Sequence, residues 1–139
     1  MQTIALSGIV THGQKRIFKT KIFAKWLKSS ELTDQDLVGA VMEMSKGLYG
    51  ADLGCNVFKK RIAIGNRGKS HGVRTIVATK LSIHWFFIFG FKKNERANIN
   101  NVELAYLQKT AESLLESTSS KIDQLLNEKI LIEVKHGGH

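Results

Sequence analysis

The sequence predicts one α+β domain, in which N-terminal and C-terminal helices pack on a twisted antiparallel sheet. Three observations lead to this expectation. The 139 residues suit a single domain, and a chain of this length buries a core without disulfides or a structural metal. Apolar residues recur at helical spacing towards both ends of the chain and at strand spacing in its middle. The composition, 42% hydrophobic and 24% charged, is typical of a folded globular protein.

The first third of the chain predicts a short strand followed by two helices. Residues 16–20 (RIFKT) have an extended pattern, which becomes helical up to Leu27. Thr33 with Asp36 three residues later resembles a capping box, so a second helix is expected to start there. This helix should end near Gly47, and its apolar stripe consists of Leu37, Val41, Met44 and Leu48.

The middle of the chain predicts three strands. They are residues 57–64 (VFKKRIAI), 73–80 (VRTIVATK) and 84–91 (HWFFIFGF), and their short connections predict an antiparallel meander. The third strand is apolar on both faces and should therefore be central in the sheet. In the first strand, alternation puts Lys59 and Arg61 on one face and Lys60 on the other. One face of this strand is therefore cationic.

The last third predicts two more helices and an edge strand. Asn100 with Glu103 marks a helix start, and a second helix should run over about residues 120–127. Residues 130–134 (ILIEV) form a short candidate edge strand. The expected order is therefore β-α-α-β-β-β-α-α-β, all within one domain spanning residues 1–139.

The positive charge of the chain is concentrated in one block. Ten basic residues and a single acid lie between Cys55 and Arg96, a net of +9, whereas the charges of the remaining residues cancel. Phosphate neutralisation with release of counterions supplies most non-specific affinity for nucleic acids. A polyanion is therefore the expected partner, and a merely solvated basic face is the alternative.

Several other classes of protein are not favoured. The longest apolar run, residues 85–91, is far below the ~20 residues that a membrane span requires. Residues 2–10 lack the features of a secretory signal, and the single cysteine, Cys55, fits a reducing compartment. We therefore expect a cytoplasmic protein.

No cofactor or metal is expected either. The string GNRGKS is not a phosphate-binding P-loop, because Ala63 stands where that loop needs its first glycine and a strand follows. The motifs HExxH, CxxC and GxSxG are absent. The histidines are scattered along the chain, at His12, His71, His84, His136 and His139.

Several strings taken together resemble one protein family. They are FKTKIFAKW at 18–26, ADLG at 51–54, KKRIA at 59–63, GKS with GVR at 68–74, and FFIFGFKKNERANI at 86–99. In this order they are similar to RelE/HigB-type toxins of bacterial type II toxin–antitoxin systems, in the branch associated with phages and plasmids. The likeness covers about residues 16–135. Residues 1–15 lie outside it, as an extension or an upstream start.

The resemblance implies a microbial-RNase-like fold and a metal-independent endoribonuclease that cuts mRNA in the ribosomal A site. A cognate antitoxin would inhibit it. Residue by residue, the catalytic face implied is Lys59, Arg61, Lys69, Arg74 and Lys93. The RNA-binding residues implied are Lys60, Arg67, His71, Lys92, Asn94 and Arg96.

Two positions depart from the family pattern. His71 stands where relatives often have glycine, and the Arg and Tyr that RelE uses downstream have no counterpart, since Asn94 follows Lys93. The identity of the proton-transfer groups is therefore open. For Lys60, as for Lys80, a solvated charge on the sheet face is the alternative to RNA binding.

The residues themselves are consistent with such a reaction. Cleavage of RNA by its own 2′-hydroxyl needs a proton acceptor, a proton donor and cations around a phosphorane. A lysine among several arginines loses its proton more easily than an isolated one, so Lys59 or Lys69 is a candidate base. His71 is another candidate for proton transfer, and Arg61 with Arg74 would hold the phosphate. The alternative function is a non-catalytic nucleic-acid-binding protein, or a degenerate toxin within a repressor complex.

Overall fold

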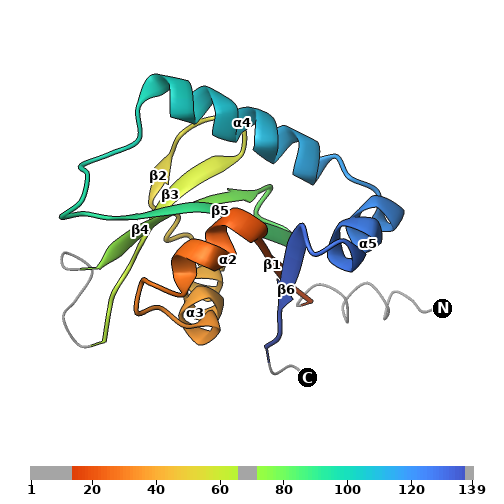
Figure 1. Cartoon of the computed structure of the whole chain (residues 1–139), viewed down its shortest axis with the longest axis horizontal. Helices are drawn as coiled ribbons and strands as arrows, with labels where there is room; N and C mark the ends of the chain where they lie inside the picture. The colour runs from red at the N-terminus through yellow and green to blue at the C-terminus, as the bar shows by residue number, and fades with distance from the viewer. Residues whose placement is uncertain (1–13, 66–71, 137–139) are drawn as a thin grey trace.

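The computed structural model describes residues 14–65 and 72–136, which form a six-stranded sheet with helices on both faces (Figure 1). The strand order is β2-β3-β4-β5-β1-β6. The strands are β1 (Arg16–Thr20), β2 (Ala51–Asp52), β3 (Val57–Ile62), β4 (Val73–Thr79), β5 (His84–Lys92) and β6 (Leu131–Val134). The helices are α2 (Lys21–Leu27), α3 (Asp34–Ser45), α4 (Asn101–Leu115) and α5 (Ser119–Asn127). The predicted α+β class is confirmed.

The sheet topology confirms the predicted meander and adds two features. Strands β3, β4 and β5 pair antiparallel in order, and β5 is central, as its two apolar faces predicted. However, β1 pairs parallel with β5 and antiparallel with β6, so the sheet is mixed. The two-residue strand β2, at the far edge, was not predicted. The edge strand expected near the C-terminus is β6.

The helix starts agree with their sequence signals. Thr33 and Asp36 form a complete capping box at α3, and Asn100 and Glu103 form another at α4. In each box the first side chain accepts a backbone N–H of the helix, and the carboxylate accepts the N–H of the capping residue. These contacts fix where α3 and α4 begin relative to the sheet.

The two faces of the sheet support separate cores. In Figure 1, α2 and α3 lie below the sheet and α4 crosses above it. The lower core is made of side chains from α2, α3 and the strands, among them Phe23, Leu37, Val41, Trp85 and Phe87. The upper core, beneath α4 and α5, includes Phe18, Ile76, Phe86, Leu107, Ala111 and Ile122. We refer to these faces as the α3 side and the α4 side.

A glycine in β5 lets α2 pack directly against the sheet. The ring of Trp26 lies so close to Gly90 that a Cβ there would be 2.3 Å from a ring carbon. Only the absence of a side chain permits this approach. The neighbouring Phe89 and Phe91 pack with the core on the α4 side. The end of β5 is therefore held between the two layers.

Across the residues that the structure describes, no helix has the length and apolar character needed to cross a bilayer.

Candidate active site

Three cations of the predicted catalytic set lie on one face of neighbouring strands. Arg61 on β3 is directly opposite Arg74 on β4, and Arg74 is opposite Phe91 on β5. Lys59, two residues before Arg61, has its side chain on the same face. Its partner across the strands, Ile76, belongs with Phe91 to the core beneath α4. We call Lys59, Arg61 and Arg74 the cationic row, and it lies on the α4 side.

The two arginines of this row repel each other. Directly opposed residues of antiparallel strands have Cβ atoms ~4.5–5.5 Å apart, and like charges at such positions are destabilising. Arg74 is only 6% exposed, and its Nη1 lies 3.4 Å from the carbonyl oxygen of Gly72. Burial, and to a smaller extent the charge of Arg61, lowers the pKa of the Arg74 guanidinium. An anion bound between the two guanidinium groups would relieve this repulsion.

The ion pairs found among the described residues leave the cationic row out. They join Arg16 to Glu133, Lys19 to Asp34, Lys60 to Glu43 and Arg96 to Glu103. Lys59 instead donates a hydrogen bond from Nζ to the side-chain oxygen of Asn98, at 3.2 Å. A neutral acceptor holds an ammonium group without cancelling its charge. The row therefore keeps its positive potential.

The segment that joins β5 to α4 lies next to the row, and Arg96 holds it in place. The guanidinium of Arg96 lies over the rings of Phe89 and Phe91, 6.0 and 5.7 Å from their centroids. It also donates two hydrogen bonds to the carboxylate of Glu103, and this bonding raises the pKa of Arg96 and lowers that of Glu103. Arg96 therefore ties the start of α4 to the aromatic end of β5.

The donor set of this site contains lysine, arginine and amide groups. In residues 14–65 and 72–136, no three His, Cys, Asp or Glu side chains come together as a metal-binding group.

A comparison with known families identifies the chain. A sequence profile described as the RelE toxin of the RelE/RelB toxin–antitoxin system matches residues 15–134. The chain belongs to the RelE toxin family. No curated protein matches it. The family resemblance read from the sequence is thus confirmed, and membership of the RelE family implies a RelB-type antitoxin as a partner.

Lys60 has a different environment in this RelE-family chain from the one expected. It points away from the cationic row and is 4% exposed. Its Nζ lies 2.7 Å from Oε1 of Glu43 on α3 and 3.0 Å from the carbonyl oxygen of Leu48. Alternation places it beneath α3, where a buried ammonium needs such partners. The alternative of a solvated charge is therefore wrong: Lys60 joins α3 to β3, and binding RNA would require it to give up its contact with Glu43.

Arg96 also has hydrogen-bond partners within the protein. It was predicted to bind RNA, but Glu103 and the carbonyl oxygen of Asn98 already accept all the hydrogen bonds that the structure shows for its guanidinium. Binding a phosphate there would require Glu103 to give up this contact. In the structure described, Arg96 organises the segment before α4.

Some of the remaining predicted residues of this RelE-family site lie at one end of the sheet. The others fall outside the residues that the structure describes. Ile62, Val73 and Lys92 are aligned across β3, β4 and β5, so this end is common to the three strands. Lys92 is half-buried there, and Lys93 and Asn94 are exposed in the turn that follows. Arg67, Lys69 and His71 lie outside the described residues, so their roles stay predictions.

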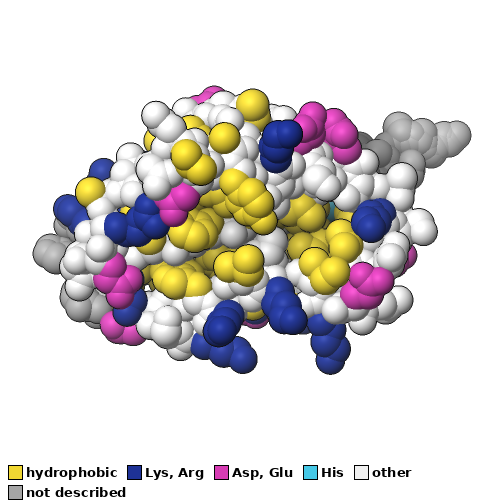
Figure 2. Space-filling model, turned by 45° about the horizontal axis from the view of Figure 1, so that its top comes forward, with side chains coloured by type: hydrophobic (Ala, Val, Ile, Leu, Met, Phe, Trp, Pro, Cys, Tyr) yellow, Lys and Arg dark blue, Asp and Glu magenta, His cyan; other side chains and the backbone are white. Residues whose placement is uncertain are grey.

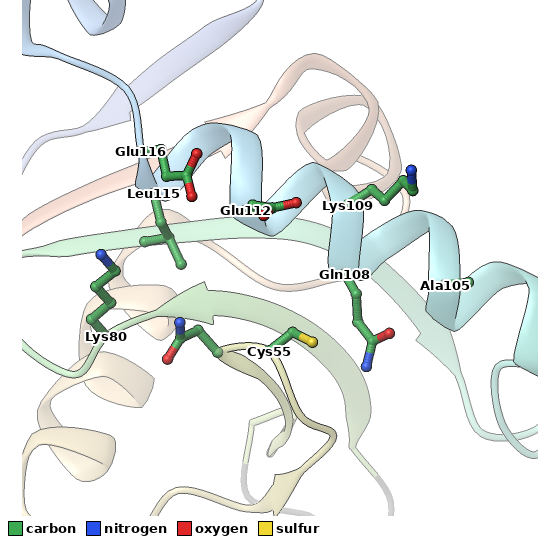
Figure 3. Close-up of a pocket in the computed structure, with 9 residues that line it drawn as sticks. Cys55, Lys80, Ala105, Gln108, Lys109, Glu112, Leu115 and Glu116 are labelled. Atoms are coloured by element: carbon green, nitrogen blue, oxygen red, sulfur yellow. The ribbon is translucent and has the colours of Figure 1, made fainter.

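One cavity is separate from the cationic row. It has a volume of about 500 Å³ and lies between α4 and the start of β3 (Figure 3). Glu112 of α4 and Glu116, the residue that follows α4, line one side, and Lys80 and Cys55 line the other. These mixed charges do not favour a polyanion, so we do not assign the RNA site there.

A smaller cavity, of about 230 Å³, adjoins the row. It lies between α3 and the end of β3, and its lining includes Gln35, Gly39 and Arg61. A Cβ built on Gly39 would meet no atom within 4 Å, so α3 is open at this point. Arg61 therefore lines this cavity beside α3 and is also directly opposite Arg74.

One face of the molecule combines apolar and cationic groups. Figure 2 shows hydrophobic side chains gathered in a hollow at the centre of this view, with Lys and Arg side chains around its margin. Well-exposed large hydrophobic side chains in the structure include Val102 and Tyr106 on α4 and, on a different helix, Ile22 on α2. Exposed apolar surface of this kind is often a site of protein interaction.

Sequence reasoning missed Asn98 as part of the site. Its contact with Lys59 spans 39 positions of the chain, and nothing in the local pattern indicates it. The available signal was indirect: Asn98 lies just before the capping box of α4, in the segment that must return from β5 towards the sheet.

Proposed function

We propose that this chain is the toxin of a type II toxin–antitoxin pair and that it cleaves mRNA on the ribosome. The observation that carries the proposal is the direct opposition of Arg61 and Arg74 on the α4 side, with Lys59 beside them. Family membership supports the same conclusion. Three uncompensated cations on one rigid sheet are suited to a single phosphate and the charge that develops on it.

The reaction uses the RNA's own 2′-hydroxyl as the nucleophile. The 2′-oxygen gives its proton to a base and bonds to phosphorus. The bond from phosphorus to the 5′-oxygen of the next nucleotide breaks, and that oxygen takes up a proton. The products are a 2′,3′-cyclic phosphate and a 5′-hydroxyl. Because the phosphorane carries more negative charge than the phosphodiester, cations stabilise it more than they stabilise the substrate.

Each cation of the site has a proposed role in this step. Arg61 and Arg74 hold the phosphoryl oxygens, since a guanidinium stays charged and binds two oxygens at once. Lys59 acts as the neutral amine: it accepts the 2′-proton and becomes an ammonium beside the phosphorane, with Lys69 as the alternative base. Lys93 adds positive charge at the end of β5. No cofactor or metal ion is assigned a role.

Binding of the RNA strand is proposed for four further residues of the basic block and its loop. They are Arg67, His71, Lys92 and Asn94. His71 is also the alternative proton-transfer group. We expect the ribosome to orient the 2′-hydroxyl for attack, because correct orientation of the reacting groups can lower the barrier by several kcal/mol. The place of action is then the cytoplasm, where translated mRNA is found.

The proposed partner is a RelB-type antitoxin that covers part of the basic block. The block between Cys55 and Arg96 has a net charge of +9, so acidic segments of the antitoxin would be attracted to it. Association should therefore slow as salt rises.

The test is induced expression of the chain without a partner, together with purified-protein assays. We expect growth arrest with cleavage of translated messages, whereas naked RNA stays largely intact. An Arg61→Gln variant is the control for a folded but inactive protein. Efficient cutting of free RNA would contradict the ribosome dependence. Unaffected growth at confirmed expression would instead favour a non-catalytic nucleic-acid-binding protein.

A further inference from the structure

The segment between β5 and α4 reaches back across the sheet to the cationic row. Within it, Oδ1 of Asn98 accepts a hydrogen bond from Lys59 Nζ at 3.2 Å and one from the backbone N–H of Ile99 at 2.9 Å. We propose that Asn98 is a positioning residue, which holds the side-chain nitrogen of Lys59 on the row, as the amine and as the ammonium, without adding a negative charge. This inference rests on the proposed function, where Lys59 accepts the proton of the 2′-hydroxyl.

Asn98 is itself held in place by its neighbours. Its carbonyl oxygen accepts hydrogen bonds from Nε and Nη2 of Arg96, at 3.1 and 3.0 Å. Arg96 lies over two aromatic rings of β5 and pairs with Glu103. Glu103 in turn accepts the N–H of Asn100 at the start of α4. The position of Asn98 is thus fixed by both β5 and α4.

The chemistry of the acceptor explains why an amide suits this position. Lysine has a flexible four-carbon stem, so a charge at its tip needs an anchor to stay in one place. A carboxylate would be a stronger anchor, but its charge would cancel that of Lys59 and repel the phosphate. The amide oxygen of Asn98 supplies a hydrogen bond and leaves the net charge of the row unchanged.

The first test measures the order of the Lys59 side chain directly by NMR relaxation of its ¹³C-labelled Cε. In Asn98→Ala, we expect this order to fall to that of the exposed Lys93. In the matched control Asn101→Ala, an exposed residue at the first position of α4, it should not change. Unchanged order of Lys59 in Asn98→Ala would overturn the proposal, and this readout does not depend on catalysis.

The second test compares Asn98→Ala with Asn98→Asp in single-turnover cleavage on programmed ribosomes. We expect Asn98→Ala to be about tenfold slower, with half-saturation within about twofold of the wild type, because positioning affects the chemical step. Asn98→Asp should lose more activity than Asn98→Ala, although its melting temperature stays near that of the wild type.

These two variants separate positioning from a structural role. Aspartate can accept the Ile99 N–H as asparagine does, so a purely structural role predicts that Asn98→Asp keeps its activity. That result would overturn the proposal. If the wild type itself cuts no message, the proposed function fails, and the NMR arm still decides whether Asn98 orders Lys59.

Discussion

Lys59 and Lys60 are neighbours on β3, yet they have opposite environments. Lys60 points to the α3 side, where Glu43 and the carbonyl oxygen of Leu48 surround its buried ammonium. Lys59 points to the α4 side, where a neutral amide is its described partner and Arg61 lies on the same face. Because side chains alternate along a strand, Lys60 contacts α3 within the fold, whereas Lys59 lies on the face of the candidate site.

This difference shows that the basic block does not act as a unit. Some of its cations are used within the protein, as in the pairs Lys60–Glu43 and Arg96–Glu103. Others lie together on the α4 side, outside those pairs. A net charge indicates a polyanion partner, but only the strand register shows which charges are available to it.

The largest expected effect is on the cleavage rate, and it comes from removing an arginine of the cationic row on the α4 side. Arg61→Ala or Arg74→Ala should slow single-turnover cleavage at least ~100-fold, because transition-state contacts are typically worth ~3–4 kcal/mol. Affinity for programmed ribosomes should fall by only about tenfold, since a hydrogen bond to a charged group contributes ~1.5 kcal/mol at the low end of its range.

The control for this prediction is thermal melting, which must show that both variants are folded. If cleavage falls only in proportion to binding, the arginines have no role in the transition state, and the non-catalytic alternative gains support.

The next largest effect comes from the α3 side and concerns stability. Lys60→Met keeps the length of the apolar stem but removes the ammonium, which leaves Glu43 without this partner and the carbonyl oxygen of Leu48 without its donor. We expect a loss of about 2 kcal/mol, below the ~3–5 for a fully buried pair because the carboxylate is partly exposed. Urea unfolding measures it, and a loss as small as that of the exposed Lys93→Met would show that the pair contributes nothing.

A smaller effect is expected for the ion pair between Arg96 and Glu103 on the α4 side, and it concerns how stability depends on pH. Since Arg96 lowers the pKa of Glu103, this carboxylate stabilises the fold above its unfolded pKa, and the contribution disappears as pH falls through its folded value. The melting temperatures of the wild type and Glu103→Gln should therefore differ at neutral pH and converge in acid. A difference that persisted at pH 2 would show that charge is not the cause.

The sequence predicted the local features of this fold well. The capping boxes at Thr33 and Asn100, the alternation along β3 and the central place of β5 all follow from short-range patterns. The parallel pairing of β1 with β5 did not follow, because it joins segments far apart in the chain. The same holds for the site. The shared face of Lys59 and Arg61 was predictable from the alternation along β3. The contacts of Lys60 with Glu43 and of Lys59 with Asn98 were not, because they join distant segments.

The comparison of the two neighbouring lysines is also the most direct test of the central claim, that the α4 side carries the chemistry. The measurement is single-turnover cleavage of mRNA on programmed ribosomes by Lys59→Met and Lys60→Met, expressed per folded molecule. We predict that Lys59→Met loses at least ~100-fold in rate with an unchanged melting temperature, as expected for a proton-transfer group. Lys60→Met should melt earlier but cut at nearly the wild-type rate. Equal rates for the two variants, or a larger loss for Lys60→Met, would contradict the account.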